Sequence, residues 1–213
     1  MAARPVWYVA LASVLAPLTT LPVTHAETAP AQPSSQVTSK MSQTTYSLQA
    51  LNTMSDAQFV STLGGIYEHS PWVAEQAAKR RPFASSDALA AAMRHAVDSA
   101  GEDAQLKLVR AHPELAGKAA VRGELTAEST REQAGAGLDQ CTPEEFARLQ
   151  TLNQQYNEKF GFPFILAVRG YDRHGIIDNF SKRVQNDRDT ELRTSLEQIH
   201  RIAGFRLHDL ISG

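Results

Sequence analysis

The stretch TPEEFARLQTLNQQYNEKFG, residues 142–161, carries the clearest structural signal in the sequence. Thr142 and Glu145 have the spacing of a capping box, in which two side chains satisfy free backbone N–H groups at the start of a helix. Apolar residues then recur every three or four positions up to Gly161, a typical helix end. They are Phe146, Leu149, Leu152, Tyr156 and Phe160. The stretch therefore predicts an amphipathic helix with one face in a core.

Other segments carry helix signals of the same kind. Ser55 and Gln58 predict a capping box before a short helix that ends at a pair of glycines. Ser70 is predicted to cap a helix that has Pro71 at its first position. Apolar periodicity predicts further helices over residues 85–101, 102–112 and about 190–211. Together these signals predict an all-α, single-domain helical bundle.

One segment, FPFILAVRG at residues 162–170, breaks the helical pattern. Periodicity does not decide between a short strand and a buried extended segment. No second strand-like run is evident, so we expect a buried extended segment near 162–169 that crosses the bundle. Its backbone polar groups would need partners, and a ligand could supply them.

The composition excludes several classes of protein. The 213 residues are 42% hydrophobic with a formal net charge of -2, which is enough for one well-buried domain. Basic residues are scattered and balanced by acidic ones, unlike the basic footprint of nucleic-acid binders. The single cysteine, Cys141, excludes an internal disulfide framework, and we interpret it as a small filler residue. No metalloprotease, phosphate-loop or nucleophile-elbow motif is present, and no metal site is expected.

The N-terminal region has a different composition from the rest. Residues 1–26 resemble a secretory signal peptide, with an apolar run too short for a transmembrane helix. Residues 27–45 predict a disordered linker, and the folded domain is expected to cover residues 46–213. These features predict a periplasmic or exported protein, without membrane attachment after signal removal. The alternative is a cytoplasmic protein whose translation starts at Met41.

RAHPELAGKAA, residues 110–120, holds the first candidate for chemistry, His112. A residue before proline avoids the α region, so His112 is predicted to end its helix. It could be a helix C-cap that interacts with the negative end of the dipole. It could also be a general acid or base, because imidazole titrates near neutral pH.

ESTREQAGAGL, residues 128–138, holds the second candidate set. Ser129, Glu132 and Gln133 fall on one helical face. Ser129 and Glu132 also have capping-box spacing, but Gln133 has no part in such a box. The two glycines that follow cost a helix roughly 1 kcal/mol each, and they favour close approach of the backbone to a neighbour or ligand. This face could line a cavity for a small polar molecule.

Five motifs occur in an order and spacing that resemble one family: EHSPWVAEQA, AHPELAGK, LTAESTREQAGAGL, FGFPFILAVRG and RIAGFRLHDL. From about Leu48 to Leu210 the chain is similar to 2-oxo-4-hydroxy-4-carboxy-5-ureidoimidazoline (OHCU) decarboxylases. The resemblance implies an all-helical, cofactor-free enzyme of urate degradation that converts OHCU to (S)-allantoin and CO2. It also implies a homodimer.

The resemblance further implies roles for individual residues. His112 matches the catalytic histidine, and Pro113 matches its neighbour in the pocket. The polar substrate-binding helix start is matched by Ser129, Thr130, Arg131, Glu132 and Gln133. The segment that contacts substrate through its backbone is matched by Phe164, Ile165, Leu166, Ala167 and Val168. Arg206 matches an arginine that meets the substrate carboxylate, although Arg201 lies nearby.

These residue types suit a decarboxylation. Most decarboxylases need a metal, a Schiff base or a cofactor as electron sink, whereas OHCU carries its own. We hypothesise that His112 is the catalytic acid–base and that Glu132 orients and charge-pairs it. Ser129 and Gln133 would fix the polar groups of the ureido substituent and the ring. Protonation from one face would give one enantiomer.

Two other functions are compatible with the residues alone. A helical hydrolase could use the same histidine and glutamate to activate water against a ureido or imidazoline ring, without releasing CO2. A non-enzymatic helical binding module could use His112 and Glu132 merely as caps. The order of the five motifs favours the decarboxylase.

Overall fold

The structure is a computed structural model that describes residues 44–212. Its helices are α1 (Leu48–Thr53), α2 (Asp56–Leu63), α3 (Trp72–Ala78), α4 (Ser86–Asp98), α5 (Glu102–Ala111), α6 (Lys118–Val121), α7 (Ala127–Gly135), α8 (Pro143–Phe160), α9 (Arg173–Arg183) and α10 (Arg188–Leu210), with a 3-10 turn η1 (Leu138–Gln140). Strands β1 (Tyr46–Ser47) and β2 (Ile211–Ser212) pair in parallel and join the two ends of the described chain. The predicted all-α class is confirmed. The predicted signal peptide and most of the predicted linker lie outside the described residues.

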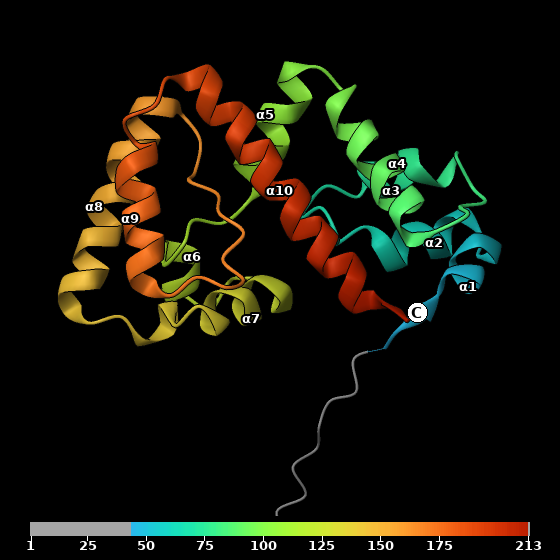
Figure 1. Ribbon diagram of the computed structural model, residues 1–213, viewed down its shortest axis with the longest axis horizontal. Coiled ribbons are helices and arrows are strands. Elements are labelled where there is room, and N and C mark those ends of the chain that lie inside the picture. The colour runs from blue at the N-terminus through green and yellow to red at the C-terminus, as the bar shows by residue number, and fades with distance from the viewer. Residues whose placement is uncertain (1–43, 213) are drawn as a thin grey trace, which may run out of the picture. The chain divides into compact units, whose positions relative to one another are not determined.

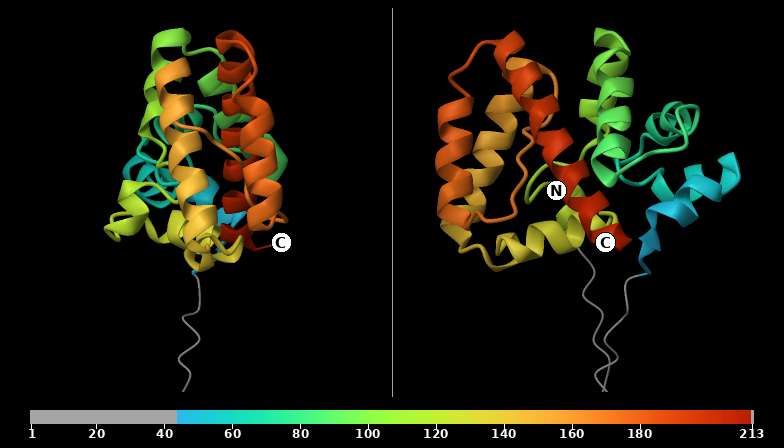
Figure 2. Two further views of the ribbon diagram at one scale, coloured as in Figure 1. Left: turned by 90° about the vertical axis from the view of Figure 1, so that its left-hand side faces the viewer. Right: turned by 45° about the vertical axis from the view of Figure 1, so that its right-hand side comes forward.

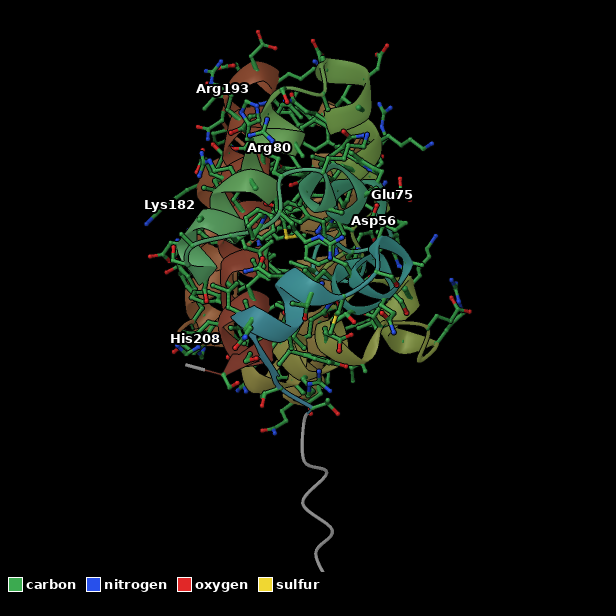
Figure 3. All side chains as sticks on the ribbon, turned by 90° about the vertical axis from the view of Figure 1, so that its right-hand side faces the viewer. Asp56, Glu75, Arg80, Lys182, Arg193 and His208 are labelled. Carbon is green, nitrogen blue, oxygen red and sulfur yellow. The ribbon has the colours of Figure 1, made fainter. Side chains whose placement is uncertain are left out.

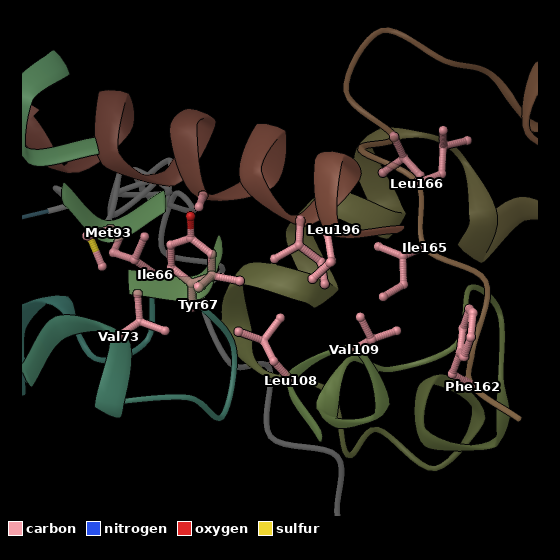
Figure 4. Close-up of a cluster of buried hydrophobic side chains, with 14 of the residues drawn as sticks. Ile66, Tyr67, Val73, Met93, Leu108, Val109, Phe162, Ile165, Leu166 and Leu196 are labelled. Carbon is pink, nitrogen blue, oxygen red and sulfur yellow. The ribbon is translucent and has the colours of Figure 1, made fainter. Parts of the chain in front are cut away.

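Helix α10 is the central element of the bundle. Helices α8 and α9 lie side by side on one side of it, and α1 to α4 lie on the other (Figures 1 and 2). Helix α10 contacts α4 and α5 as well as α8, so its buried residues pack against helices on both of its sides. Figure 4 shows this core, with Tyr67 after α2, Val109 of α5 and Ile165 of the extended segment around α10.

Most of the predicted helix boundaries agree with the structure. The capping boxes at Ser55 and Thr142 are both present. The prediction at Ser70 is wrong, because Pro71 occupies the cap position of α3 and no side chain caps that helix. Helices α1, α6 and α9 were not predicted. Their sequences are short or interrupted, so they give little periodicity.

The extended segment before α9 is confirmed. Residues 163–168 form no regular secondary structure and are buried. Arg183 Nη1 donates to the carbonyl of Ile165 at 2.7 Å, and the N–H of Ala167 donates to Gln198 Oε1 at 3.1 Å. Side chains of α9 and α10 thus supply some of the hydrogen bonds that a sheet would otherwise provide.

The outer surface of the bundle is charged. Asp56, Glu75, Lys182 and Arg193 extend into solvent from different helices (Figure 3). Among residues 44–212, no helix combines the length and the apolar character needed to cross a bilayer.

Candidate active site

The two candidate stretches line one inner cavity of about 40 Å³. His112 and Pro113 enter it from the loop after α5, and Ser129, Glu132 and Gln133 enter it from α7. The remaining walls come from Glu68, Leu115, the segment Phe164–Arg169, Ile202, Phe205 and Arg206. Segments far apart in the sequence therefore meet at a single site.

His112 is both a helix cap and a wall of the cavity. Helix α5 ends at Ala111, and His112 follows it with φ -76° and ψ 141°, as the following proline predicts. Its Nδ1 lies 3.0 Å from the carbonyl oxygen of Leu108, which can only accept a hydrogen bond, so Nδ1 carries the proton. The lone pair of the neutral ring is then on Nε2. Capping therefore selects the tautomer that chemistry at Nε2 requires.

The environment of His112 keeps its ring neutral. The side chain is 7% exposed, and burial lowers its pKa. The hydrogen bond to Leu108 and the charge of Glu68 oppose this effect, and the charges of Arg206 and His69 add to it. A neutral imidazole at neutral pH can accept a proton before it donates one.

Four amide side chains hold the loop that follows His112. Ala116, at the end of this loop, has a positive φ of 50°. Two of the side chains bond to Ala116: Gln133 Oε1 accepts from its N–H at 2.9 Å, and Gln150 donates to its carbonyl at 2.7 Å. Asn153 donates to the Leu115 carbonyl at 3.0 Å. Asn157 donates to Glu114 Oε1 at 2.6 Å. These bonds explain how the strained backbone persists. They also fix Pro113 beside the cavity.

Helix α7 presents its predicted polar face to the cavity, but it begins earlier than the capping pattern at Ser129 predicts. The N-cap is Thr126, whose Oγ1 accepts from the N–H of Ser129 at 3.2 Å. Ser129 is therefore inside the first turn, and its hydroxyl is free to bond elsewhere. Thr130 and Arg131 are exposed and do not line the inner cavity, because they point away from this helical face. The structure does not bring Thr130 to the site, and Arg131 lines only the outer cavity that adjoins it.

Arg206 is buried at the cavity wall, whereas Arg201 is exposed. Arg206 Nε lies 2.8 Å from Glu132 Oε1, and its Nη2 lies 2.8 Å from Glu132 Oε2. This is a bidentate pair of the kind that arginine forms with carboxylates. The hypothesis that Glu132 orients His112 does not match this geometry. Within the described chain, the hydrogen bonds of the Glu132 carboxylate go to Arg206.

Sequence reasoning missed Glu68, which is 2% exposed and lines the cavity. Its carboxylate accepts from Ser129 Oγ at 2.8 and 2.6 Å, from Thr126 Oγ1 at 2.6 Å and from Arg206 Nη2 at 3.1 Å. Burial alone would raise the pKa of Glu68. The two hydroxyl donors and the charges of Arg206 and His112 outweigh it and hold the pKa below its ordinary value. Glu68 therefore remains a carboxylate at neutral pH.

A larger outer cavity of about 510 Å³ adjoins the inner one. Glu132, Arg169 and Arg206 line both cavities. The inner cavity is much smaller than the outer one. An organic molecule at His112 would therefore have to extend toward the outer cavity or displace side chains between the two.

The OHCU decarboxylase family profile matches residues 52–208. The chain belongs to the OHCU decarboxylase family. It is 44% identical over 165 residues to the 2-oxo-4-hydroxy-4-carboxy-5-ureidoimidazoline decarboxylase of Haloferax volcanii, an alignment that covers 78% of this chain and 96% of that protein. The Mus musculus protein of the same name is 39% identical over 161 residues, covering 76% of this chain and 90% of its own.

Solved structures agree with the family assignment. A crystal structure of (S)-allantoin synthase has a TM-score of 0.64 and 34% identity, covering 78% of this chain and 54% of that one. A crystal structure of OHCU decarboxylase in the presence of (S)-allantoin, at 20% identity and a TM-score of 0.56, shows the same fold. The resemblance carried by the five motifs is thus confirmed. The roles that it assigns to individual residues stay predictions.

Proposed function

We propose that this OHCU decarboxylase family member converts OHCU to allantoin and CO2 in urate degradation, at the inner cavity. The observation that carries the proposal is the placement of a buried neutral imidazole, His112, and a buried guanidinium, Arg206, on one cavity. The guanidinium suits a carboxylate, and the imidazole suits proton transfer.

The name of the substrate defines the electron flow. C4 of the ring carries the hydroxyl and the carboxylate, and the ring C=N bond joins the neighbouring C5 to N1. When the C4–carboxylate bond breaks, its electron pair forms a C4=C5 bond, and the C=N pair moves to N1, which takes a proton. The C4 hydroxyl then loses its proton to become a carbonyl, and C5 gains a proton. One proton is consumed overall, because a carboxylate leaves as neutral CO2.

His112 is assigned the proton transfer between oxygen and carbon. Its neutral Nε2 accepts the hydroxyl proton, and the resulting imidazolium delivers a proton to one face of C5. Fixed delivery to one face accounts for a single enantiomer, which we propose to be (S)-allantoin. The hydrogen bond to Leu108 keeps the ring oriented in both steps.

Backbone groups of the extended segment are assigned to substrate recognition. The Ile165 carbonyl and the Ala167 N–H are already bonded to Arg183 and Gln198. Within the described part of the chain, the N–H and C=O of Leu166 have no hydrogen-bond partner. They lie beside the cavity, and we assign them to the polar edge of the ring.

The test uses OHCU generated in place from urate by the two preceding enzymatic steps. Circular dichroism follows the product, and released CO2 is measured in parallel. Wild type and the His95→Asn control, which changes an exposed histidine on α4, should give a fast and lasting optical signal. His112→Asn should give only racemic product at the spontaneous rate. Ring consumption without CO2 would instead identify a hydrolase.

Assembly and location are further proposals. We propose a homodimer, to be tested by analytical ultracentrifugation at micromolar concentration, where a monomer mass would contradict it. We also propose export by the N-terminal signal. N-terminal sequencing of protein from the native host should find Glu27 first, and a start at Met41 or Ser42 would refute export.

A further inference from the structure

We infer that Glu68 is a positioning residue for the proposed reaction: it holds Arg206 in place while Glu132 yields its position on Arg206 to the substrate carboxylate. The inference rests on the proposed function. It assigns different roles to two carboxylates that bind the same guanidinium.

The surroundings of the two carboxylates differ. The side chain of Glu132 is 23% exposed, and its hydrogen bonds run to Arg206. Glu68 is 2% exposed and is held by Ser129 and Thr126 as well as by Arg206. Glu132 also borders the outer cavity, into which its side chain can turn. Glu132 is therefore the exchangeable partner and Glu68 the permanent one.

Glu132 occupies the edge of Arg206 that a substrate would need. A bidentate contact to Nε and Nη2 is the usual way in which arginine binds a carboxylate. When Glu132 leaves, Arg206 still has Glu68 and Ser129 at Nη2 and the Gly65 carbonyl at 3.3 Å from Nη1. Gly65 and Glu68 belong to the same loop. This loop therefore holds the guanidinium at Nη1 and Nη2 and makes no hydrogen bond to Nε.

The negative charge of Glu68 also acts on the protonation of His112. With neutral His112, the cluster formed by Arg206, Glu68 and Glu132 holds one guanidinium and two carboxylates. Substrate exchange with Glu132 keeps that count unchanged. The charge of Glu68 stays in place and favours the imidazolium that forms when His112 takes up a proton. The other charged or titratable groups that act on His112 are Arg206 and His69, and both disfavour the imidazolium.

The kinetic test compares Glu68→Gln with Glu191→Gln, a matched variant of another buried glutamate that pairs with an arginine. Glu68→Gln is expected to lower kcat at least tenfold while KM changes less than threefold, because Arg206 keeps its charge. The acidic limb of the kcat/KM profile should move to lower pH. Glu191→Gln should lower the melting temperature and leave that limb unmoved.

A second measurement does not depend on substrate. The His112 ring is titrated by proton NMR in the free protein, where its pKa should be lower in Glu68→Gln than in wild type. Glu68→Asp keeps the charge but shortens the side chain, so kcat should fall while the His112 pKa changes little. This variant carries the test should Glu68→Gln not fold.

Each outcome decides. An unchanged His112 pKa in Glu68→Gln, or wild-type kcat in folded Glu68→Asp, would overturn the inference. If the acidic limb of the kcat/KM profile moves by the same amount in Glu191→Gln, the effect of Glu68 is a general structural one and the inference is overturned. Wild type that leaves OHCU to its spontaneous decay would sink the proposed function, while the NMR titration would still report on the pairing of Glu68 with His112.

Discussion

Removing the charge of Arg183 should destabilise the fold and release the extended segment from α9. Arg183 Nη2 lies 2.9 Å from Glu191 Oε2, and Glu191 is 0% exposed. Asn186 donates to the same carboxylate at 2.7 Å, and the Tyr156 hydroxyl also donates to it. In Arg183→Met this carboxylate stays buried without its cation, and the Ile165 carbonyl loses its donor.

The size of the effect follows from the burial of the pair. Removing one partner of a buried ion pair costs about 3–5 kcal/mol. In a domain of roughly 150–250 residues, each kcal/mol lowers the melting temperature by about 2–4 °C. The melting temperature of Arg183→Met should therefore fall by about 6–20 °C.

Thermal unfolding followed by far-UV circular dichroism measures this change. Arg193→Met, an exposed change on α10, serves as control and should lie close to wild type (Figure 3). The double variant Arg183→Met/Glu191→Leu removes both charges and should recover much of the loss. A fall of less than 2 °C in the single variant, or no recovery in the double, would refute the reasoning.

Three other predictions concern the same core. Tyr67→Phe should lower the free energy of unfolding by about 1–3 kcal/mol, because the Tyr67 hydroxyl bonds His200 Nδ1 at 2.7 Å and this buried ring atom would lose its partner. Urea unfolding measures the change, and an unchanged midpoint would contradict this prediction. Gln133→Leu leaves the Ala116 N–H unpaired, so the free energy of unfolding should fall by about 1–3 kcal/mol and kcat should also fall. A variant with wild-type stability and kcat would show that the loop does not need this hydrogen bond. Burial lowers the pKa of both His112 and His200 below 6.5. On acidification the unfolded chain takes up protons first, so the free energy of unfolding should decline as the pH falls below about 6.5 and level off above about 7.5. Urea titrations at pH 7.5 and 5.5 check the sign, and equal stabilities would refute it.

The parts of the fold that sequence alone predicts are those with local causes. Thr142 and Glu145 lie three residues apart and cap α8 as their spacing requires. The proline after His112 ends α5 where predicted. At the start of α7, Ser129 and Glu132 have capping-box spacing, but Thr126 caps the helix by accepting from the N–H of Ser129. The helix begins at Thr126, which leaves the Ser129 hydroxyl for Glu68.

Glu68 was missed because its partners are distant in the sequence. Thr126 follows it by 58 residues and Arg206 by 138. No spacing rule connects such positions, and a lone glutamate after a glycine turn is usually a surface residue. The same limit applies to the Gln150, Asn153 and Asn157 side chains on α8. A polar face on a helix predicts solvent, whereas here it holds the loop beside His112.

The pairing of Arg206 with Glu132 also limits how tightly the site can hold a bare carboxylate. Without Glu132, Arg206 Nε would be buried without a hydrogen-bond partner, and Glu132 removes that cost in the free protein. An incoming carboxylate therefore replaces a bidentate pair with another bidentate pair, and the net gain from that contact is small. Under the proposed assignment of site residues, the ring and ureido groups supply most of the binding through the extended segment and α7. Once CO2 leaves, its contact with Arg206 is lost, and Glu132 can return to the guanidinium. Weak net binding of the leaving group is what a decarboxylase needs, because strong binding of the ground-state carboxylate would raise the barrier to its departure.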